Sequence, residues 1–150
     1  LPNRLSLMEQ LQEQVQLEDP GCLLFCDLDH FKRINDNFGH SQGDALLCQL
    51  AQRINDAIGH HRFFARLAGD EFILLLPGYN THQAEEVTEV IRQAMEAPFV
   101  VNGQPMQVGI SIGVSHYQSG WSPEQWLIQA DRAMYCDKNS GFIALAEQSS

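Results

Sequence analysis

Apolar side chains recur along the first third of the chain at helical and strand spacings. Residues 5–17 carry them every three or four positions and predict an amphipathic helix. Residues 22–28 are continuously apolar up to Asp27, which is typical of a central strand buried on both faces. Residues 42–58 return to the helical period, with a predicted start at the S-x-x-D pattern of Ser41. The predicted core positions of the two helices are Leu5, Met8, Leu11, Val15, Leu47, Leu50, Ala51, Ile54 and Ile58.

The middle of the chain predicts a hairpin followed by a helix. Residues 62–67 and 71–76 have strand character, and Ala68-Gly69-Asp70 forms a tight turn between them. Either Asn80 or Thr81 can cap the helix that follows. Its predicted core face consists of Ala84, Val87, Val90, Ile91 and Ala94.

The last third predicts a second hairpin and a final helix. Asn102-Gly103 is a strong hairpin signal, joining residues 99–101 to one long alternating strand over residues 106–115. The second face of that strand is small, so we expect a helix to pack closely against it. Residues 122–125 form a capping box with Pro at the first helical position, and residues 142–145 are expected to form a short edge strand.

Length, charge and cysteine content fit one globular domain spanning residues 1–150. A chain of 150 residues with 44% hydrophobic side chains can bury a single core. The element order predicts an α/β (α+β) fold, with helices flanking a mixed, mainly antiparallel sheet. The net charge of -10 argues against nucleic acid or an anionic membrane as partners, so a polyanionic ligand would need local cations or a metal. The cysteines form no C-x-x-C pair, and reduced thiols suit a cytoplasmic protein.

Two carboxylates are candidates for a metal site. Asp27 ends a buried strand and Asp70 lies at a hairpin tip, so the two would converge if the strands are neighbours. Mg²⁺ prefers such oxygen ligands together with substrate phosphates. Gly69 would let a phosphate or ribose approach the backbone, and Lys32 and Lys138 could meet phosphates. Taken singly, each residue also fits a structural role as a turn residue or a solvated lysine, as do His60 and His61 in an exposed loop.

Several segments occur together in one order. Residues 27–44 follow the pattern D-x-D-x-F-K-x-I-N-D-x-x-G-H-x-x-G-D, and residues 68–72 read Ala-Gly-Asp-Glu-Phe. Ser-Ile-Gly stands at residues 111–113, and A-D-x-A-M-Y with a following Lys and Gly spans residues 130–141. Over nearly its whole length the chain resembles the GGDEF family of diguanylate cyclases, with residues 1–4 matching the end of a truncated opening motif.

The resemblance implies a palm-like nucleotide-cyclase fold and a role for each matching residue. Asp27 and Asp70 would ligate Mg²⁺ or Mn²⁺ with the Leu28 carbonyl, and Glu71 would support the metal and catalysis with Asp70. The implied substrate contacts are Asn35 and Asp44 to guanine, Lys32 and Lys138 to the triphosphate, and the backbones of Phe31 and Gly69 to the phosphates. Two GTP molecules would be joined into cyclic di-GMP by an antiparallel homodimer, usually controlled by attached sensory domains.

The sequence also departs from the family pattern. Ala68 replaces the first signature Gly, and Asp137 and Phe142 replace an Ala and an Arg around Lys138. The family's product-inhibition motif R-x-x-D would span residues 59–62, but these read Gly-His-His-Arg. An active cyclase without that feedback site is the favoured hypothesis. A GTP-binding regulatory module beside another domain, for example a cyclic di-GMP phosphodiesterase, and a pure scaffold are the alternatives.

Overall fold

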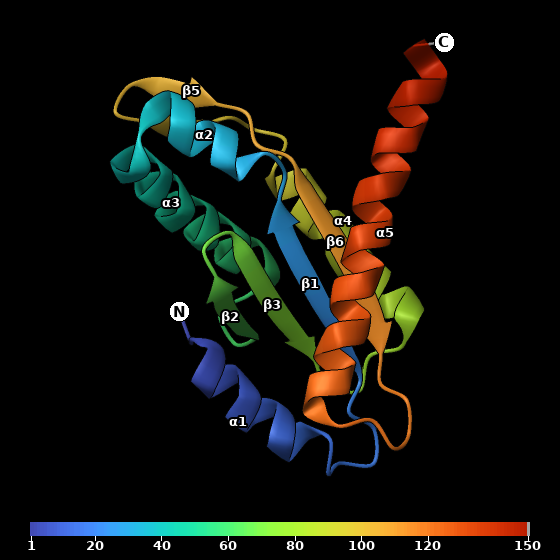
Figure 1. The fold of residues 1–150 in the computed structure, drawn as a ribbon. Coiled ribbons are helices and arrows are strands. Elements are labelled where there is room, and N and C mark those ends of the chain that lie inside the picture. The colour runs from blue at the N-terminus through green and yellow to red at the C-terminus, as the bar shows by residue number, and fades with distance from the viewer. Residues whose placement is uncertain (150) are drawn as a thin grey trace.

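The computed structural model describes the backbone of residues 1–149 and the side chains of residues 1–138 (Figure 1). Helices and strands alternate along the chain, as the hydrophobic pattern predicts. The elements are α1 (Arg4–Gln14), β1 (Cys22–Leu28), α2 (Phe31–Phe38), α3 (His40–Ile58), β2 (Phe63–Ala68), β3 (Glu71–Leu76), α4 (Thr81–Ala94), β4 (Phe99–Val101), β5 (Gln104–Met106), β6 (Ile110–His116) and α5 (Pro123–Ser149).

A four-stranded sheet with the order β2-β3-β1-β6 forms the centre of the molecule. All its pairings are antiparallel, and β1 lies between β3 and β6. Six of the seven β1 side chains are buried, which confirms the prediction of a central strand. Strands β4 and β5 form a separate two-stranded sheet.

Helices cover both faces of this sheet, which confirms the predicted α/β class (Figure 1). Leu23 and Phe25 of β1 pack in one apolar cluster with residues of α1 and α5. Leu24 and Cys26, one position along in each case, pack in the other cluster with residues of α3 and α4. The strand period of two therefore divides one continuous apolar run between two layers of core.

Helix α5 packs against β6 as closely as backbone atoms allow. A Cβ added to Gly113 would overlap backbone atoms of Ala130, Ala133 and Met134 in α5. This confirms the expectation that a helix packs against the small face of this strand. The capping box of Ser122 and Gln125 is also present, with both reciprocal hydrogen bonds at 3.1 and 3.2 Å.

The beginning of α3 and the whole of α2 differ from the sequence prediction. Helix α2 has only eight residues, and its N-cap His30 adopts a left-handed φ of 59° without a side-chain capping bond. Helix α3 begins at His40 after Gly39, whose φ is 89°, so the predicted start at Ser41 is wrong. A short helix between two unusual backbone positions leaves no cap signal in the sequence.

The predicted long strand over residues 106–115 is broken into two strands. Gln107 turns its side-chain amide to the carbonyls of Met95 and Glu96, at 3.3 and 3.0 Å. The Gly109 carbonyl accepts a hydrogen bond of 3.0 Å from the Asp29 backbone N–H. These bonds move residues 107–109 from the outer hairpin to the central sheet, so the alternating pattern spans two sheets.

The predicted edge strand at residues 142–145 is wrong, because α5 continues through them. Ala-Leu-Ala-Glu-Gln, which begins at Ala144, is rich in strong helix formers, whereas one Gly at position 141 costs a helix only about 1 kcal/mol. The side chain of Phe142 lies outside the described residues.

Two predicted core faces are partly displaced. Leu5 is 69% exposed and Val90 is 41% exposed, whereas Leu7 and Thr88 are buried. Helix α1 also ends at Gln14 rather than at residue 17. Both helices are rotated about their axes relative to the prediction. With 3.6 residues per turn, two neighbouring stripes on each helix could have faced the core, and the sequence pattern does not decide between them. The Asn80 cap of α4 is confirmed as a capping box with Gln83.

Cysteines fall into a buried pair and an exposed pair. Burial raises the pKa of the Cys22 thiol to about 11 and that of Cys26 to about 12. Cys48 on α3 and Cys136 on α5 are exposed free thiols.

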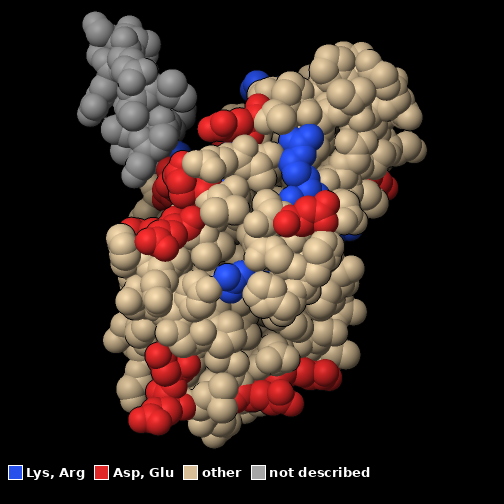
Figure 2. Space-filling view, turned by 180° about the vertical axis from the view of Figure 1, so that it is seen from behind, with Lys and Arg blue, Asp and Glu red and all other residues tan. Residues whose placement is uncertain are grey.

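Within the described residues, every helix is too short or too polar to cross a bilayer. Figure 2 shows acidic side chains in several groups on the far face of the molecule, with basic side chains in smaller groups between them.

Candidate functional site

The carboxyl end of β1 and the β2–β3 turn bring together the acidic residues that the sequence singles out. Asp27 pairs in register with Glu71 of β3 on one side and with Ser111 of β6 on the other. The Leu28 N–H donates to the Asp70 carbonyl oxygen at 3.2 Å, which ties the turn to the end of β1. The predicted convergence of Asp27 and Asp70 is therefore present.

Asp27 occupies an unfavourable place for a negative charge. Burial, together with the neighbouring negative charge of Asp70, raises the pKa of its carboxyl to about 6, although Lys138 acts in the opposite direction. Its Oδ2 lies 3.2 Å from the Lys138 ammonium, but its buried Oδ1 has no hydrogen-bond partner. An acceptor oxygen without a partner beside a second carboxylate is suited to receive a cation.

Glu71 experiences similar crowding at the start of β3. Burial raises the pKa of its carboxyl, and the negative charges of Asp70 and Asp131 add to this effect. A carboxylate with a raised pKa is a stronger proton acceptor than an ordinary one. Glu71 is thus chemically suited to the supporting catalytic role that the resemblance implies.

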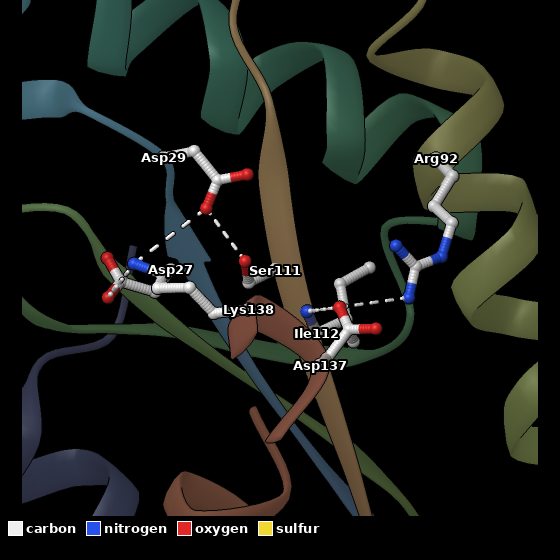
Figure 3. Close-up of polar contacts among 7 residues, drawn as sticks. All are labelled: Asp27, Asp29, Arg92, Ser111, Ile112, Asp137 and Lys138. Carbon is white, nitrogen blue, oxygen red and sulfur yellow. Dashed lines mark hydrogen bonds and ion pairs between the residues drawn. The ribbon is translucent and has the colours of Figure 1, made fainter. Parts of the chain in front are cut away.

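Lys138 of α5 bridges two carboxylates of the β1 end (Figure 3). Its ammonium lies 3.2 Å from Asp27 Oδ2 and 3.7 Å from Asp29 Oδ1. The Ser111 hydroxyl donates to the same Asp29 oxygen at 2.7 Å. The sequence prediction assigned no role to Asp29 or Ser111. The D-x-D spacing was the available signal, because residues two apart on a strand share one face.

This site fits a divalent cation supplied together with a phosphate ligand. Among the side chains described, no group of three or more His, Cys, Asp or Glu residues could bind a metal without other ligands. Mg²⁺ is usually bound by one or two carboxylates, with phosphates and water completing its coordination. Asp27 and Asp70, with the unpartnered oxygen of Asp27, match that donor set.

A second candidate subsite lies between α2 and α3. The Oδ1 atom of Asn35 is buried without a partner, and a Cβ at Gly43 would collide with it. The missing side chain at Gly43 thus lets α3 approach α2 at the point where Asp44 follows, exposed to solvent. Phe31 is buried and Lys32 is exposed in the first turn of α2. The predicted contacts of these residues with nucleotide stay predictions.

The hairpin tip has open space around its glycine. No atom lies within 4 Å of a Cβ built on Gly69, whose carbonyl accepts from Arg66 Nε at 3.0 Å. A register shift between Arg66 and Ala68 marks a bulge next to this turn. In the described part of the chain, His30 and Asn102 alone combine a side chain with a positive φ, so Ala68 carries no left-handed strain.

The stretch at the position of the R-x-x-D motif has a structural role. Arg62 donates to the Ile58 carbonyl at 3.0 Å and to the Tyr79 hydroxyl at 2.7 Å. Gly59 ends α3 with a φ of 100°. His60 and His61 are exposed, as predicted.

Asp137 does not direct its charge toward Lys138, although the sequence suggests that it could weaken phosphate binding there. Its Oδ2 accepts from the Ile112 backbone N–H at 2.9 Å and from Arg92 at 3.3 Å (Figure 3). The nearest cation for Asp137 is therefore Arg92 of α4, so Lys138 can interact with the β1 end.

Comparisons with known proteins agree in the family that they indicate. The sequence profile described as "Diguanylate cyclase, GGDEF domain" matches residues 1–143. The diguanylate cyclase DgcP of Pseudomonas aeruginosa is 37% identical over 94% of this chain, and the bifunctional diguanylate cyclase/cyclic di-GMP phosphodiesterase MucR of the same species is 35% identical over 94%. The chain spans 22% and 21% of these two proteins. The crystal structure of the GGDEF domain of YfiN (TpbB) from P. aeruginosa superposes with a TM-score of 0.86 at 33% identity, covering 93% of this chain and 91% of that one.

Proposed function

The chain belongs to the GGDEF family, and on that premise we propose that it is a diguanylate cyclase. It binds GTP with Mg²⁺ or Mn²⁺, and two copies in antiparallel arrangement join two GTP molecules into cyclic di-GMP and pyrophosphate. The observation that carries this proposal is the crowded pair of Asp27 and Asp70, with one buried oxygen unpartnered and Lys138 alongside.

The metal and the acidic residues divide the chemistry. When bound, the divalent cation polarises the α-phosphate and stabilises the negative charge of the leaving pyrophosphate. Asp27 and Asp70 would hold it, with the Leu28 carbonyl and Glu71 as further ligands. The raised pKa of Glu71 and the charge of Asp70 favour these two carboxylates as acceptors of the proton from the attacking ribose 3′-hydroxyl.

Each of the two coupling steps is balanced. The 3′-oxygen of one GTP bonds to the α-phosphorus of the other while the bond from that phosphorus to pyrophosphate breaks. The hydroxyl proton leaves to the carboxylates of the site. Each domain contributes one GTP, so the step occurs twice and requires two domains face to face. Lys32 and Lys138 neutralise the triphosphate, and the backbones at Phe31 and Gly69 approach it closely.

Guanine specificity follows from the subsite between α2 and α3. The Oδ1 atom of Asn35 is a buried acceptor without a partner, and it lies against Gly43. Asp44, the residue after Gly43, offers a carboxylate. Guanine presents an N1–H and an exocyclic amine as donors, whereas adenine would leave these acceptors unpaired. Because Gly59 and Arg62 replace the R-x-x-D residues, the domain has no high-affinity product feedback site there.

A second candidate is a GTP-binding module that regulates a neighbouring domain. The observation in its favour is that MucR, of which the chain covers 21%, is described as bifunctional. Ala68 and Phe142 also depart from the family pattern. Under this hypothesis the chain binds GTP with Mg²⁺ but forms no product.

Turnover distinguishes the two candidates. The chain, alone and fused to a dimerising helix, is incubated with GTP and Mg²⁺, and cyclic di-GMP is measured by mass spectrometry. Asp70→Ala removes a site carboxylate, and Asp56→Ala removes an exposed carboxylate of α3 as a matched control. Product from the parent and from Asp56→Ala, but not from Asp70→Ala, is the expected result.

Thermal stabilisation by GTP with Mg²⁺ completes the test, because a ligand that binds the folded state raises its melting temperature. Stabilisation without product supports the regulatory module. If the chain shows neither product nor stabilisation, the site binds no GTP and both candidates are wrong.

A further inference from the structure

Asp137 and Lys138 are the last two residues of α5 whose side chains are described, and their charged groups contact different neighbours (Figure 3). Asp137 accepts from the Ile112 N–H at 2.9 Å and from Arg92 of α4 at 3.3 Å. Lys138 reaches the opposite way, to Asp27 at 3.2 Å. One carboxylate thus connects α5 to α4 and β6, and the next side chain enters the candidate site.

The backbone bond to Ile112 joins α5 to an edge of the sheet. Among the strands of residues 1–149, β6 ends the sheet order, with β1 as its neighbour on one side. A backbone N–H at such an edge has no strand to pair with and needs another acceptor. Asp137 supplies this acceptor, so its position along the sheet is fixed to one residue of β6.

A second connection joins the neighbouring residues of β6 and α5, Ser111 and Lys138, through Asp29. Ser111 precedes Ile112 on β6, and its hydroxyl orients Asp29, which in turn lies 3.7 Å from Lys138. Adjacent residues of β6 are therefore linked to adjacent residues of α5. Two neighbouring connections fix both the height of α5 along the sheet and the direction of the Lys138 side chain.

We propose that Asp137 is a positioning residue that places Lys138 at the carboxyl end of β1 through its bonds to Ile112 and Arg92. Arg92 compensates the charge of Asp137, so the carboxylate does not compete for the lysine ammonium. The part of this inference that concerns nucleotide affinity rests on the proposed function.

Chemical labelling tests the position of Lys138 without any nucleotide. The chain has only two lysines, and Lys32 is exposed, so its acetylation rate serves as an internal standard. We expect Asp137→Ala to raise the rate at Lys138 relative to Lys32 about two- to tenfold, the range for one lost hydrogen bond. Glu89→Ala, which removes a carboxylate from α4, is the matched control and should leave the ratio unchanged. An unchanged ratio in Asp137→Ala, or an equal rise in the control, would overturn the inference.

Conservative variants keep the test valid if Asp137→Ala does not fold. Asp137→Asn retains an oxygen that can accept from Ile112 but loses the ion pair with Arg92. It should raise the labelling ratio less than Asp137→Leu, which fills a similar volume but can accept a hydrogen bond from neither Ile112 nor Arg92. A full rise in Asp137→Asn alone would show that the bond to Ile112 positions nothing.

Nucleotide affinity then separates positioning from a general effect on folding. Asp137→Ala should weaken binding of GTP with Mg²⁺ about two- to tenfold in the parent chain and leave it unchanged in a Lys138→Ala background. Equal weakening in both backgrounds would contradict the inference, because the effect would not pass through Lys138. If the parent chain binds no GTP, the proposed function fails, while the labelling ratio still decides whether Asp137 positions Lys138.

Discussion

Two glycines mark two different regions of this molecule. Gly113 lies where α5 crosses β6, and any side chain there would overlap the backbone of the helix. Gly69 lies at the hairpin tip beside Asp70, and a Cβ there would meet no atom within 4 Å. The interior of the sheet is thus filled to the backbone, whereas the site at its edge has open space, like charges and unpartnered acceptors.

The sheet interior and the site at its edge have different tasks. In the interior, side chains and backbone are closely packed, and this packing stabilises the fold. The site retains interactions that are unfavourable in the free protein, such as the buried oxygen of Asp27, and that a cation would make favourable. Substitutions that fill space should therefore be costly in the interior, and substitutions that neutralise charge should be stabilising in the site.

Gly113→Ala should cause the largest loss of stability. The methyl group would overlap backbone atoms of α5 rather than the end of a flexible side chain, so the helix must shift away from β6. We expect the free energy of unfolding to fall by about 3 kcal/mol. Urea denaturation followed by circular dichroism measures this change. A loss below about 1 kcal/mol would mean that α5 can move freely on the sheet.

The pH dependence of stability should show the strain at Asp27. Burial and Asp70 raise the pKa of this carboxyl from 3.8 to about 6. Between these values the folded state binds more protons at Asp27 than the unfolded state, so its contribution to stability is lost as the pH rises through about 6. Because the carboxyl is only partly enclosed, the expected loss is about 1 to 2 kcal/mol.

Asp27→Asn isolates this contribution. Its free energy of unfolding relative to the parent should increase between pH 4 and pH 7, since the amide does not titrate. Urea titrations of both proteins at half-unit intervals measure the difference. A difference that stays constant over this range would mean that Asp27 titrates normally.

Asp70→Asn should be more stable than the parent and unable to respond to nucleotide. Loss of the negative charge relieves the repulsion that acts on Asp27 and Glu71. The expected gain is about 0.5 to 1 kcal/mol at pH 8, accompanied by loss of thermal stabilisation by GTP with Mg²⁺. Asp131→Asn, which removes a charge that acts on Glu71, is the matched control and should retain the nucleotide response. A destabilised Asp70→Asn would contradict the view of a strained site.

Gly69→Ala should have the smallest effect on stability. The position has open space and no positive φ, so the free energy of unfolding should change by less than about 0.5 kcal/mol. Differential scanning calorimetry beside Gly113→Ala compares the two glycines under identical conditions. A large loss at Gly69 would show that the turn is as constrained as the interior, and the comparison would fail.

Elements with a strong period could be predicted from the sequence, and so could the acidic pair. Strand β1, the β2–β3 hairpin, the Asn80 cap of α4 and the capping box of α5 lie where local patterns place them, because each is specified by neighbouring residues. Asp27 and Asp70 met as expected because antiparallel neighbours bring a strand end and a hairpin tip to the same edge.

Features that depend on distant contacts could not be predicted. The break at residues 107–109 arises from Gln107 bonding to carbonyls after α4 and from Gly109 bonding to Asp29. The partner of Asp137 is an arginine 45 positions away, and no local pattern links the two. The sequence shows only that Asp137 precedes Lys138, and the ion pair with Arg92 becomes visible in the folded chain.

The distribution of thiols offers a route to observe motion in solution. Cys48 on α3 and Cys136 on α5 are exposed, whereas Cys22 and Cys26 are buried with a pKa of about 11 and 12 and stay protonated at neutral pH. A maleimide or nitroxide reagent should therefore modify one cysteine on each of two helices that cover opposite faces of the sheet. Dipolar spectroscopy between two such spin labels would follow the separation of α3 and α5 as GTP and Mg²⁺ are added, without any engineered cysteine.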